Sequence, residues 1–551
     1  MRFFRKTLLI LVSGLLVGTI SSCKKRSEEP AEEEQYVPPV KDPLVIPTVD
    51  VENLTINLPA KPTYNQGSPR SEGDYDIIDL YEVSDFHGAV DYKPSDSNAY
   101  IGLSKLASYF DGKRAINPGG TLVLSSGDMF QGSADSNSTR GYMVNYCMNY
   151  MGFDAMSLGN HEFDWTDTWI KKNAELAYEG HTIPYLGINI YDKATGSLPS
   201  FLQKSTIVER GDYKIGIIGA MGNALESSIL YSSIQNYEFV EEAELISTEA
   251  ARLRSEEHCD VVVLLEHQGI GEIPQVTGVD AIFGGHAHEN KTGTVGTIPA
   301  AATKNYGRGI AHIGLKINKS TKEVSPLGSA SVEGIVNATC EALPENAGIQ
   351  NIMSQYAPSI NSIKNIELAT AVDDLKFDKA LKNICTRTMF DEAEAVVKAN
   401  PTMEQLDVLC AFHNVNGGIR DDIRAGKVTY GSVYSAFPFD NEVVLIKASG
   451  TLLKQKLVNM KDLGVCRTFQ LKTDIDSSKD YYVVATDFLA LSNQYLNSSA
   501  SGLKEMTDAD LIRTGLIVRD VVANKIYKLD KIKSSDFPNS EACYKNIPMS
   551  F

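Results

Sequence analysis

The first candidate for chemistry is the stretch Gly159–Asp164, which places an amide oxygen, an imidazole and a carboxylate within the five positions from Asn160 to Asp164. The apolar run DAMSL precedes it, and a helical pattern follows it, so the stretch is expected at the C-terminal end of a strand. Sheets of α/β proteins carry their chemistry at such ends. An isolated Asn-His pair in a loop is usually only a turn, so the interpretation depends on partners elsewhere.

Similar polar residues follow four other apolar runs, which are IIDLYEVSD, TLVLSSGD, CDVVVLLEHQG and DAIFGGHAHE. Their oxygen and nitrogen donors, with no thiolate among them, suit Zn²⁺, Mn²⁺, Mg²⁺ or Ca²⁺. With the amide counted, there are seven ligand candidates: Asp85, His87, Asp128, Asn160, His267, His286 and His288. Seven ligands exceed the number that one tetrahedral ion takes, so we expect two divalent ions. Asp128 is the natural candidate to bridge them with its two carboxylate oxygens.

The elements that must position these residues alternate between short apolar runs and helical patterns from about Asp76 onward. Such alternation predicts an α/β protein in which helices cover the sheets. With 551 residues, the chain is too long for one core. We expect five segments: a signal peptide over 1–22, a disordered tether over 23–75, a catalytic domain over 76–330, a helical connector over 331–365 and a C-terminal domain over 366–551.

The N-terminus carries an export pattern, with basic residues followed by the apolar run TLLILVSGLLVGTI. The run ends at Cys23 in a motif that resembles a bacterial lipoprotein lipobox, so we expect acylation of this cysteine. A plain signal peptide with a chance cysteine is the alternative. The charged, proline-rich segment that follows favours a tether. The expected location is the bacterial cell envelope, with a lipid anchor in the membrane and the protein facing the periplasm or the exterior. The net charge of −18 argues against a nucleic-acid polymer as partner.

The motifs DFHG, SSGDMFQGS, LGNHEFD, LEHQG and FGGHAH, in this order, resemble the signature blocks of the calcineurin-like metallophosphoesterases. Within them, LGNHEFDW and GDMFQGS are similar to the 5′-nucleotidase group, with its UDP-sugar hydrolase and 2′,3′-cyclic-nucleotide phosphodiesterase relatives. The resemblance implies a four-layer β-sandwich flanked by helices, then a smaller α/β domain. It also implies the ligand sets, which are Asp85, His87, Asp128 and His288 for one ion and Asp128, Asn160, His267 and His286 for the other.

The same resemblance implies that the protein hydrolyses 5′-nucleotides to a nucleoside and phosphate. Two neighbouring ions lower the pKa of a water molecule, which then displaces the ester oxygen. His161 would stabilise the transition state or the leaving group, and Asp164 would orient the imidazole and raise its basicity.

A later segment, NVNGGIRDDIRAGKVTYGSVYSAFPFDNEVV, resembles the substrate-binding domain of 5′-nucleotidases. By this resemblance, Asn416 and Arg420 contact the nucleotide, and Phe439 stacks on its base. Without the flanking motif, Phe439 would be interpreted as core packing. Tyr495 is expected to supply a second aromatic ring, although the glycines that usually precede this ring in the family are missing.

Three other functions stay open from the sequence. The same metal centre could act on 2′,3′-cyclic nucleotides or nucleotide sugars, or on a phosphate ester that contains no nucleotide. A surface lipoprotein that only binds its ligand is a further alternative, but the intact ligand set argues against it.

Overall fold

The computed structural model describes residues 41–42, 44–64, 67–457, 463–467, 475–492, 496, 503 and 505–537, with only the backbone considered over 463–467. Two predicted site residues, Cys23 and Tyr495, lie outside this described part. No helix among the described residues is long and apolar enough to cross a membrane.

The first half of the chain contains two large sheets. The eight-stranded sheet has the order β15-β14-β2-β3-β4-β5, with β1 on β2 and β16 on β14. Its strands are β1 (Ser71–Glu72), β2 (Tyr75–Glu82), β3 (Thr121–Ser125), β4 (Ala155–Ser157), β5 (Tyr185–Leu186), β14 (Gly309–Asn318), β15 (Val324–Pro326) and β16 (Ser331–Gly334). Because β2, β3 and β4 are parallel, their C-terminal ends lie at one edge of the sheet.

The six-stranded sheet has the order β12-β13-β11-β10-β8-β7. Its strands are β7 (Ser205–Arg210), β8 (Tyr213–Met221), β10 (Val261–His267), β11 (Ala281–Gly284), β12 (Lys291–Val295) and β13 (Ile298–Ala302). The strand β10 is buried over its whole length, as expected for a central strand of a parallel sheet that is covered on both faces. A small two-stranded sheet pairs β6 (Ile190–Asp192) with β9 (Tyr237–Phe239).

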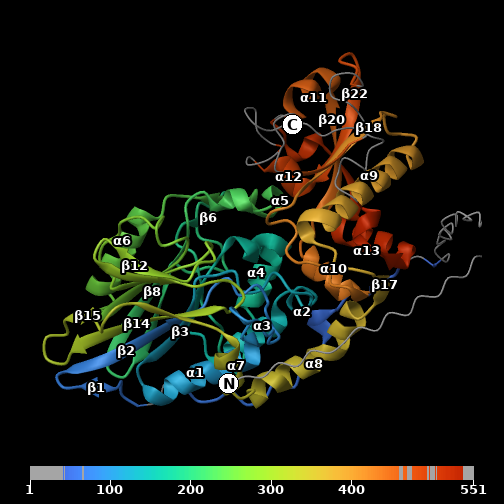
Figure 1. The fold of residues 1–551 in the computed structure, drawn as a ribbon. Coiled ribbons are helices and arrows are strands. Elements are labelled where there is room, and N and C mark those ends of the chain that lie inside the picture. The colour runs from blue at the N-terminus through green and yellow to red at the C-terminus, as the bar shows by residue number, and fades with distance from the viewer. Residues whose placement is uncertain are drawn as a thin grey trace, which may run out of the picture. The chain divides into compact units, whose positions relative to one another are not determined.

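The two sheets pack face to face through one core, in which Leu80 and Leu122 of one sheet meet Ile215 and Leu265 of the other. Figure 1 shows both sheets between α6 on one side and α1 and α3 on the other. The helices of this half are α1 (Gly102–Ile116), α2 (Ala134–Asn137), α3 (Tyr142–Met151), α4 (Thr166–Ala174), α5 (Tyr231–Ile234) and α6 (Ala243–Ser255). This helix–sheet–sheet–helix arrangement confirms the predicted four-layer fold class.

Two helices follow the sandwich, α7 (Asn337–Ala342) and α8 (Ala347–Lys364). The rest of the chain forms a five-stranded sheet of order β21-β18-β22-β20-β23 and a three-stranded sheet of order β19-β17-β24. Its elements are β17 (Glu367–Ala371), α9 (Lys382–Ala399), β18 (Val408–Asn414), β19 (Gly426–Thr429), α10 (Tyr430–Ala436), β20 (Glu442–Ser449), α11 (Gly450–Lys456), β21 (Leu463–Arg467), β22 (Asp480–Thr486), α12 (Asp487–Leu491), β23 (Leu511–Ile517), α13 (Val518–Leu529) and β24 (Lys531–Ile532).

The described end of the predicted tether differs from a disordered segment. Lys41 forms an ion pair with Asp530, Val51 is buried, and the backbone N–H of Asn57 donates to the side chain of Gln355 at 2.6 Å. Further along, β1 pairs with β2. The described residues of this segment are therefore held by contacts with distant parts of the chain, and the tether stays a prediction. Its basis was local composition, whereas these contacts are made with residues up to several hundred positions away.

Candidate metal centre and substrate cleft

One group of predicted ligands gathers Asp85 and His87, which follow β2, and His288, which follows β11. Nε2 of His288 lies 3.2 Å from Nε2 of His87 and 3.3 Å from Oδ1 of Asp85. One donor atom from each residue lies within 4.8 Å of the other two, so the three side chains could hold one ion.

A second group gathers Asp128, which follows β3, with His267 and His286, and its donor atoms also lie within 4.8 Å of one another. Nε2 of His267 lies 3.2 Å from Oδ2 of Asp128. The Oδ1 atom of Asn160 lies 3.1 Å from Nε2 of His267 and 3.0 Å from Nδ1 of His286. The structure therefore brings the amide into this group, as the sequence predicted.

The backbone at these strand ends has an unusual conformation. Five of the seven predicted ligands have φ between 48° and 64°, namely Asp85, His87, Asp128, His286 and His288. Non-glycine residues rarely adopt positive φ, and each such residue costs of order 1–3 kcal/mol. Backbone strain is concentrated at these five polar residues. This supports a functional site, in which the placement of the side chains is kept although the backbone conformation is unfavourable.

Two of the histidine ligand candidates, His87 and His286, fit divalent ions in their protonation as well as in their geometry. Burial lowers the pKa of His87 to about 3, and burial together with His267 lowers that of His286 to about 4. Both imidazoles are therefore neutral at pH 7, so each keeps a lone pair for a metal. Desolvation opposes ionisation of Asp128, but His267 holds the pKa of this carboxyl well below its usual range.

Backbone carbonyl groups orient two of the imidazoles. Nδ1 of His87 donates to the carbonyl oxygen of Gln131 at 2.9 Å, and Nδ1 of His267 donates to that of Ser126 at 2.7 Å. These bonds leave Nε2 of each ring facing its ligand group. At His267 burial opposes the charged ring, but Asp128 outweighs it and raises the pKa to about 10, so an ion bound there would have to displace the Nε2 proton. Sequence reasoning missed both partners, because any residue type can supply a carbonyl group.

Glu162 is a further residue that sequence reasoning missed. Its carboxylate accepts the backbone N–H groups of Asp128 at 2.9 Å, Met129 at 2.9 Å and Gly159 at 2.7 Å. The side chain thereby ties the loop after β3 to the loop after β4, which carry predicted ligands of the second group. Its position between His161 and Phe163 in the opening motif was the available signal.

His161 and Asp164 form the predicted pair, with Nδ1 of the imidazole donating to Oδ2 of the carboxylate at 2.9 Å. The backbone N–H of His161 also donates to Oδ1 of Asp128 at 2.8 Å. Burial disfavours a charged imidazole, but Asp164 and Asp128 outweigh it and raise the pKa of His161. The pair therefore sits against the second ligand group without belonging to it.

A cleft of about 220 Å³ lies in front of His161, and it contains three of the four predicted substrate residues, which are Asn416, Arg420 and Phe439. The Phe439 ring stacks on the His161 ring, with centroids 5.7 Å apart and planes at 28°. The Arg420 guanidinium reaches within 3.4 Å of Nε2 of His161. The fourth residue, Tyr495, lies outside the described part of the chain, but Phe488 also lines the cleft.

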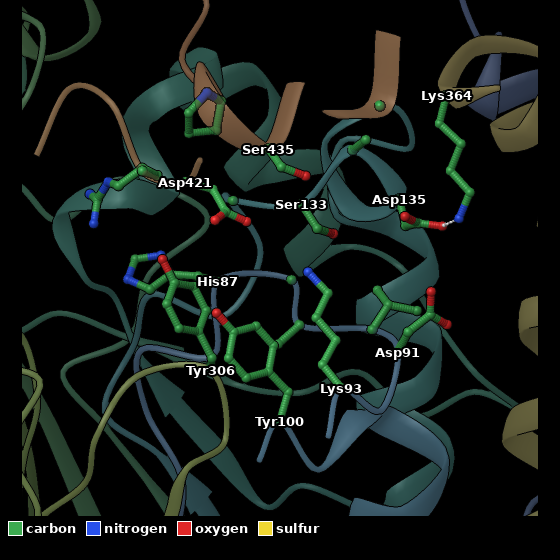
Figure 2. Close-up of a pocket in the computed structure, with 18 of the residues that line it drawn as sticks. His87, Asp91, Lys93, Tyr100, Ser133, Asp135, Tyr306, Lys364, Asp421 and Ser435 are labelled. Carbon is green, nitrogen blue, oxygen red and sulfur yellow. Dashed lines mark hydrogen bonds and ion pairs between the residues drawn. The ribbon is translucent and has the colours of Figure 1, made fainter. Parts of the chain in front are cut away.

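A second cavity of about 380 Å³ borders His87 and shares Gln131, Pro438 and Arg420 with the cleft. Figure 2 shows Lys93 and Tyr100 pointing into this cavity below Ser133 and Asp421. Lysine and aspartate side chains alternate around its wall, and one such pair, Lys364 and Asp135, is joined at 2.6 Å. Its charges therefore largely balance, and no single class of ion is favoured there.

Comparison with protein families gives two matches. The family model for calcineurin-like phosphoesterases matches residues 79–290, and the model for the 5′-nucleotidase C-terminal domain matches residues 370–472. The first match covers β2 through β11 with all seven predicted ligands, and the second covers Asn416, Arg420 and Phe439.

Individual relatives are distant. A probable 5′-nucleotidase of Treponema pallidum is 24% identical over 459 residues, which are 70% of this chain and 75% of the relative. The endonuclease YhcR of Bacillus subtilis is 24% identical over 412 residues, and the match covers 68% of this chain but only 32% of that longer protein.

Among solved structures, a 5′-nucleotidase precursor from Thermus thermophilus superposes with a TM-score of 0.67 and 19% identity, over 83% of this chain and 97% of its own. That likeness establishes the fold. The two family matches together span more than half of the 551 residues. Residues 79–290 belong to the calcineurin-like phosphoesterases, and residues 370–472 belong to the 5′-nucleotidase C-terminal domains.

Proposed function

We propose that the protein is a phosphoesterase with two divalent metal ions that hydrolyses 5′-nucleotides to nucleosides and phosphate. The observation that carries this proposal is the adjacency of two ligand groups and one cleft. The cleft is lined by Asn160 and His286 of the second group and by Phe439. A nucleotide has the matching polarity, with an anionic phosphate at one end and a flat base at the other.

Asp85, His87 and His288 would hold one ion, and Asn160, His267 and His286 the other, with Asp128 shared between them. When bound, the ions supply Lewis acidity that activates water and offsets the negative charge of the phosphoryl group. The candidate ions are Zn²⁺, Mn²⁺, Mg²⁺ and Ca²⁺, and a panel of metals distinguishes them.

His161 would act on the ester oxygen. Its Nδ1 is engaged by Asp164, so only Nε2 is available to face the substrate. A raised pKa favours the protonated ring, which can donate a hydrogen bond or a proton from Nε2 to the departing oxygen. Arg420, whose guanidinium lies beside Nε2, would pair with a phosphate or ribose oxygen.

Phe439 would hold the base by stacking, which contributes about 1–3 kcal/mol per base. Phe488 or Trp165 could supply a second ring, since both line the same cleft. We assign Asn416 to polar contacts with the nucleoside, because it lines this cleft and is exposed.

The test is a panel of metals against substrates. Purified protein, stripped and reloaded with Mn²⁺, Zn²⁺, Mg²⁺ or Ca²⁺, is assayed on AMP, UDP-glucose, 2′,3′-cyclic AMP and an aryl phosphate. We expect metal-dependent release of phosphate, fastest from AMP. Faster cleavage of UDP-glucose or the cyclic nucleotide would make that ester the substrate instead of AMP. Absence of hydrolysis with every metal would refute the proposed phosphoesterase activity.

We place the protein in the cell envelope, held to the membrane by an acylated Cys23. The basic N-terminus, the apolar run and the cysteine support this proposal. Expression with a labelled fatty acid tests it: label should appear in the wild-type protein and not in Cys23→Ala. Equal labelling of both proteins, or of neither, would contradict it.

A further inference from the structure

The loop of residues 437–440, between α10 and β20, forms a wall of both cavities. It carries Phe439, whose ring stacks on His161. Pro438 lines the cleft on one side and the cavity of Figure 2 on the other. A small displacement of this loop would therefore move the aromatic ring away from the imidazole and change the width of the cleft.

Arg519, the second residue of α13, holds this loop from behind. Its Nη2 binds Oδ1 of Asp440 at 2.6 Å, and its Nη1 lies 3.3–3.5 Å from the carbonyl oxygens of residues 437, 438 and 439. Nε donates to the hydroxyl of Tyr430 at 3.0 Å, and the guanidinium lies 3.8 Å from the ring centroid of Tyr434. One side chain thus contacts every residue of the loop.

The location of Arg519 is unfavourable for a cation in two respects. The side chain is 7% exposed, so its charge is largely removed from water. It also lies in the first turn of α13, where the positive end of the helix dipole disfavours a cation. Such a cation is tolerated only when its partners are well placed. Here they are the loop, the two tyrosines of α10 and Asp520, whose Oδ1 lies 3.7 Å from Nε.

The catalytic half of the chain holds the same loop from the other side. Nη1 of Arg140 binds Oδ2 of Asp440 at 2.7 Å, so this carboxylate bridges two arginines. The carbonyl oxygen of Pro438 accepts hydrogen bonds from Nδ2 of Asn137 at 3.0 Å and from Nε2 of Gln131 at 3.3 Å. The loop is therefore fixed by both halves of the chain at once.

We propose that Arg519 and Asp440 are positioning residues that hold Phe439 where a nucleotide base can stack, with Arg140 and Asn137 completing the support from the catalytic half. This inference rests on the proposed nucleotide substrate. Neither Arg519 nor Asp440 touches the reacting atoms. Their role is to keep the loop in one conformation before substrate arrives, so that binding energy is not spent on ordering it.

Two conservative variants test the role. Asp440→Asn keeps the shape but removes the charge that both arginines bind. Arg519→Lys keeps a charge but loses the planar fork that reaches Asp440, Tyr430 and the carbonyl groups together. Asp154→Asn is the control, because Asp154 also pairs with a buried arginine, Arg210, at 2.5 Å, and it precedes β4, at the end away from the predicted ligands.

Two readouts are measured on metal-loaded protein: hydrogen exchange of the amides of residues 437, 439 and 440, and KM and kcat for AMP and an aryl phosphate. In both loop variants we expect exchange at these amides to rise at least about tenfold and KM for AMP to rise about tenfold, with kcat within about twofold. The aryl phosphate, which has no base, should keep its KM within about twofold. Asp154→Asn should leave all of these values unchanged.

Loop exchange that stays at the wild-type rate in both variants would overturn the positioning role. Faster exchange with equal losses on AMP and the aryl phosphate would overturn the link to base binding. If wild-type protein hydrolysed neither ester, the proposed function would fall, whereas hydrogen exchange would still decide whether these residues position the loop.

Discussion

The substitution Gly159→Ala should disable the second ligand group through one added methyl group. Gly159 has φ −101° and ψ −178°, an extended conformation that alanine adopts without strain. A Cβ atom there would lie 2.3 Å from Oδ1 of Asp128 and 2.7 Å from Cε1 of His267. Since optimal contacts between carbon atoms are about 3.5–4.0 Å, the imidazole or the loop must move by roughly 0.8 Å or more.

That displacement is large for a metal site, in which ligand distances hold to about ±0.2 Å. We expect the metal affinity of the second group to fall by about 10–100-fold. This is the range seen when a residue that orients a metal ligand is lost. Overpacking should also destabilise the fold by about 1–3 kcal/mol. Hydrolysis of phosphate esters should fall with the loss of the ion.

The assay combines metal content by mass spectrometry, after dialysis at a buffered free metal concentration, with the rate of aryl phosphate hydrolysis. Gly112→Ala is the control, because a Cβ there meets nothing within 4 Å and the residue lies inside α1. Circular dichroism of chelated samples shows whether the fold survives. Two bound ions and a rate within twofold of wild type in Gly159→Ala would refute the steric argument.

Three further outcomes are expected. His161→Asn should retain both metal ions but slow hydrolysis by about 10²–10⁴-fold, as for loss of a general acid; loss of metal from this variant would instead make His161 a ligand. Phe439→Leu should weaken AMP binding by about 1–3 kcal/mol, measured as KM, and should spare an aryl phosphate; equal losses on both would make Phe439 ordinary packing. Removal of metal with a chelator should abolish hydrolysis and lower the unfolding temperature, since a ligand at 100 times its Kd stabilises the folded state by about 2.7 kcal/mol; an unchanged unfolding temperature would mean that these groups hold no ion.

The sequence pattern predicted an α/β protein and the gathering of its polar residues for a physical reason, whereas the sandwich followed from the family resemblance. Parallel strands present their C-terminal ends at one edge, so residues after β2, β3 and β4 must approach one another wherever the connections run. The same holds for β10 and β11. Asp85, Asp128 and Asn160 could therefore be placed together from the order of the motifs alone.

Other features depended on long-range contacts that leave little trace in local patterns. Residues 44–64 have the composition of a tether but pack along distant segments, as the bond between Asn57 and Gln355 illustrates. The carbonyl groups that orient His87 and His267 could belong to any residue type. The second aromatic of the cleft was sought at Tyr495, which lies outside the described residues, and the structure adds Phe488 and Trp165 to the lining.

What the sequence by itself determined is the set of donors and the class of chemistry, because side-chain type decides which ions and protons a residue can hold. Only the tertiary structure decided how these side chains are held in place. Positive φ at Asp85 and Asp128, the carboxylate of Glu162 between two loops, and Arg519 behind Phe439 all arise from segments far apart in the chain. Their energies are set by packing and burial, which exist only after the chain has folded.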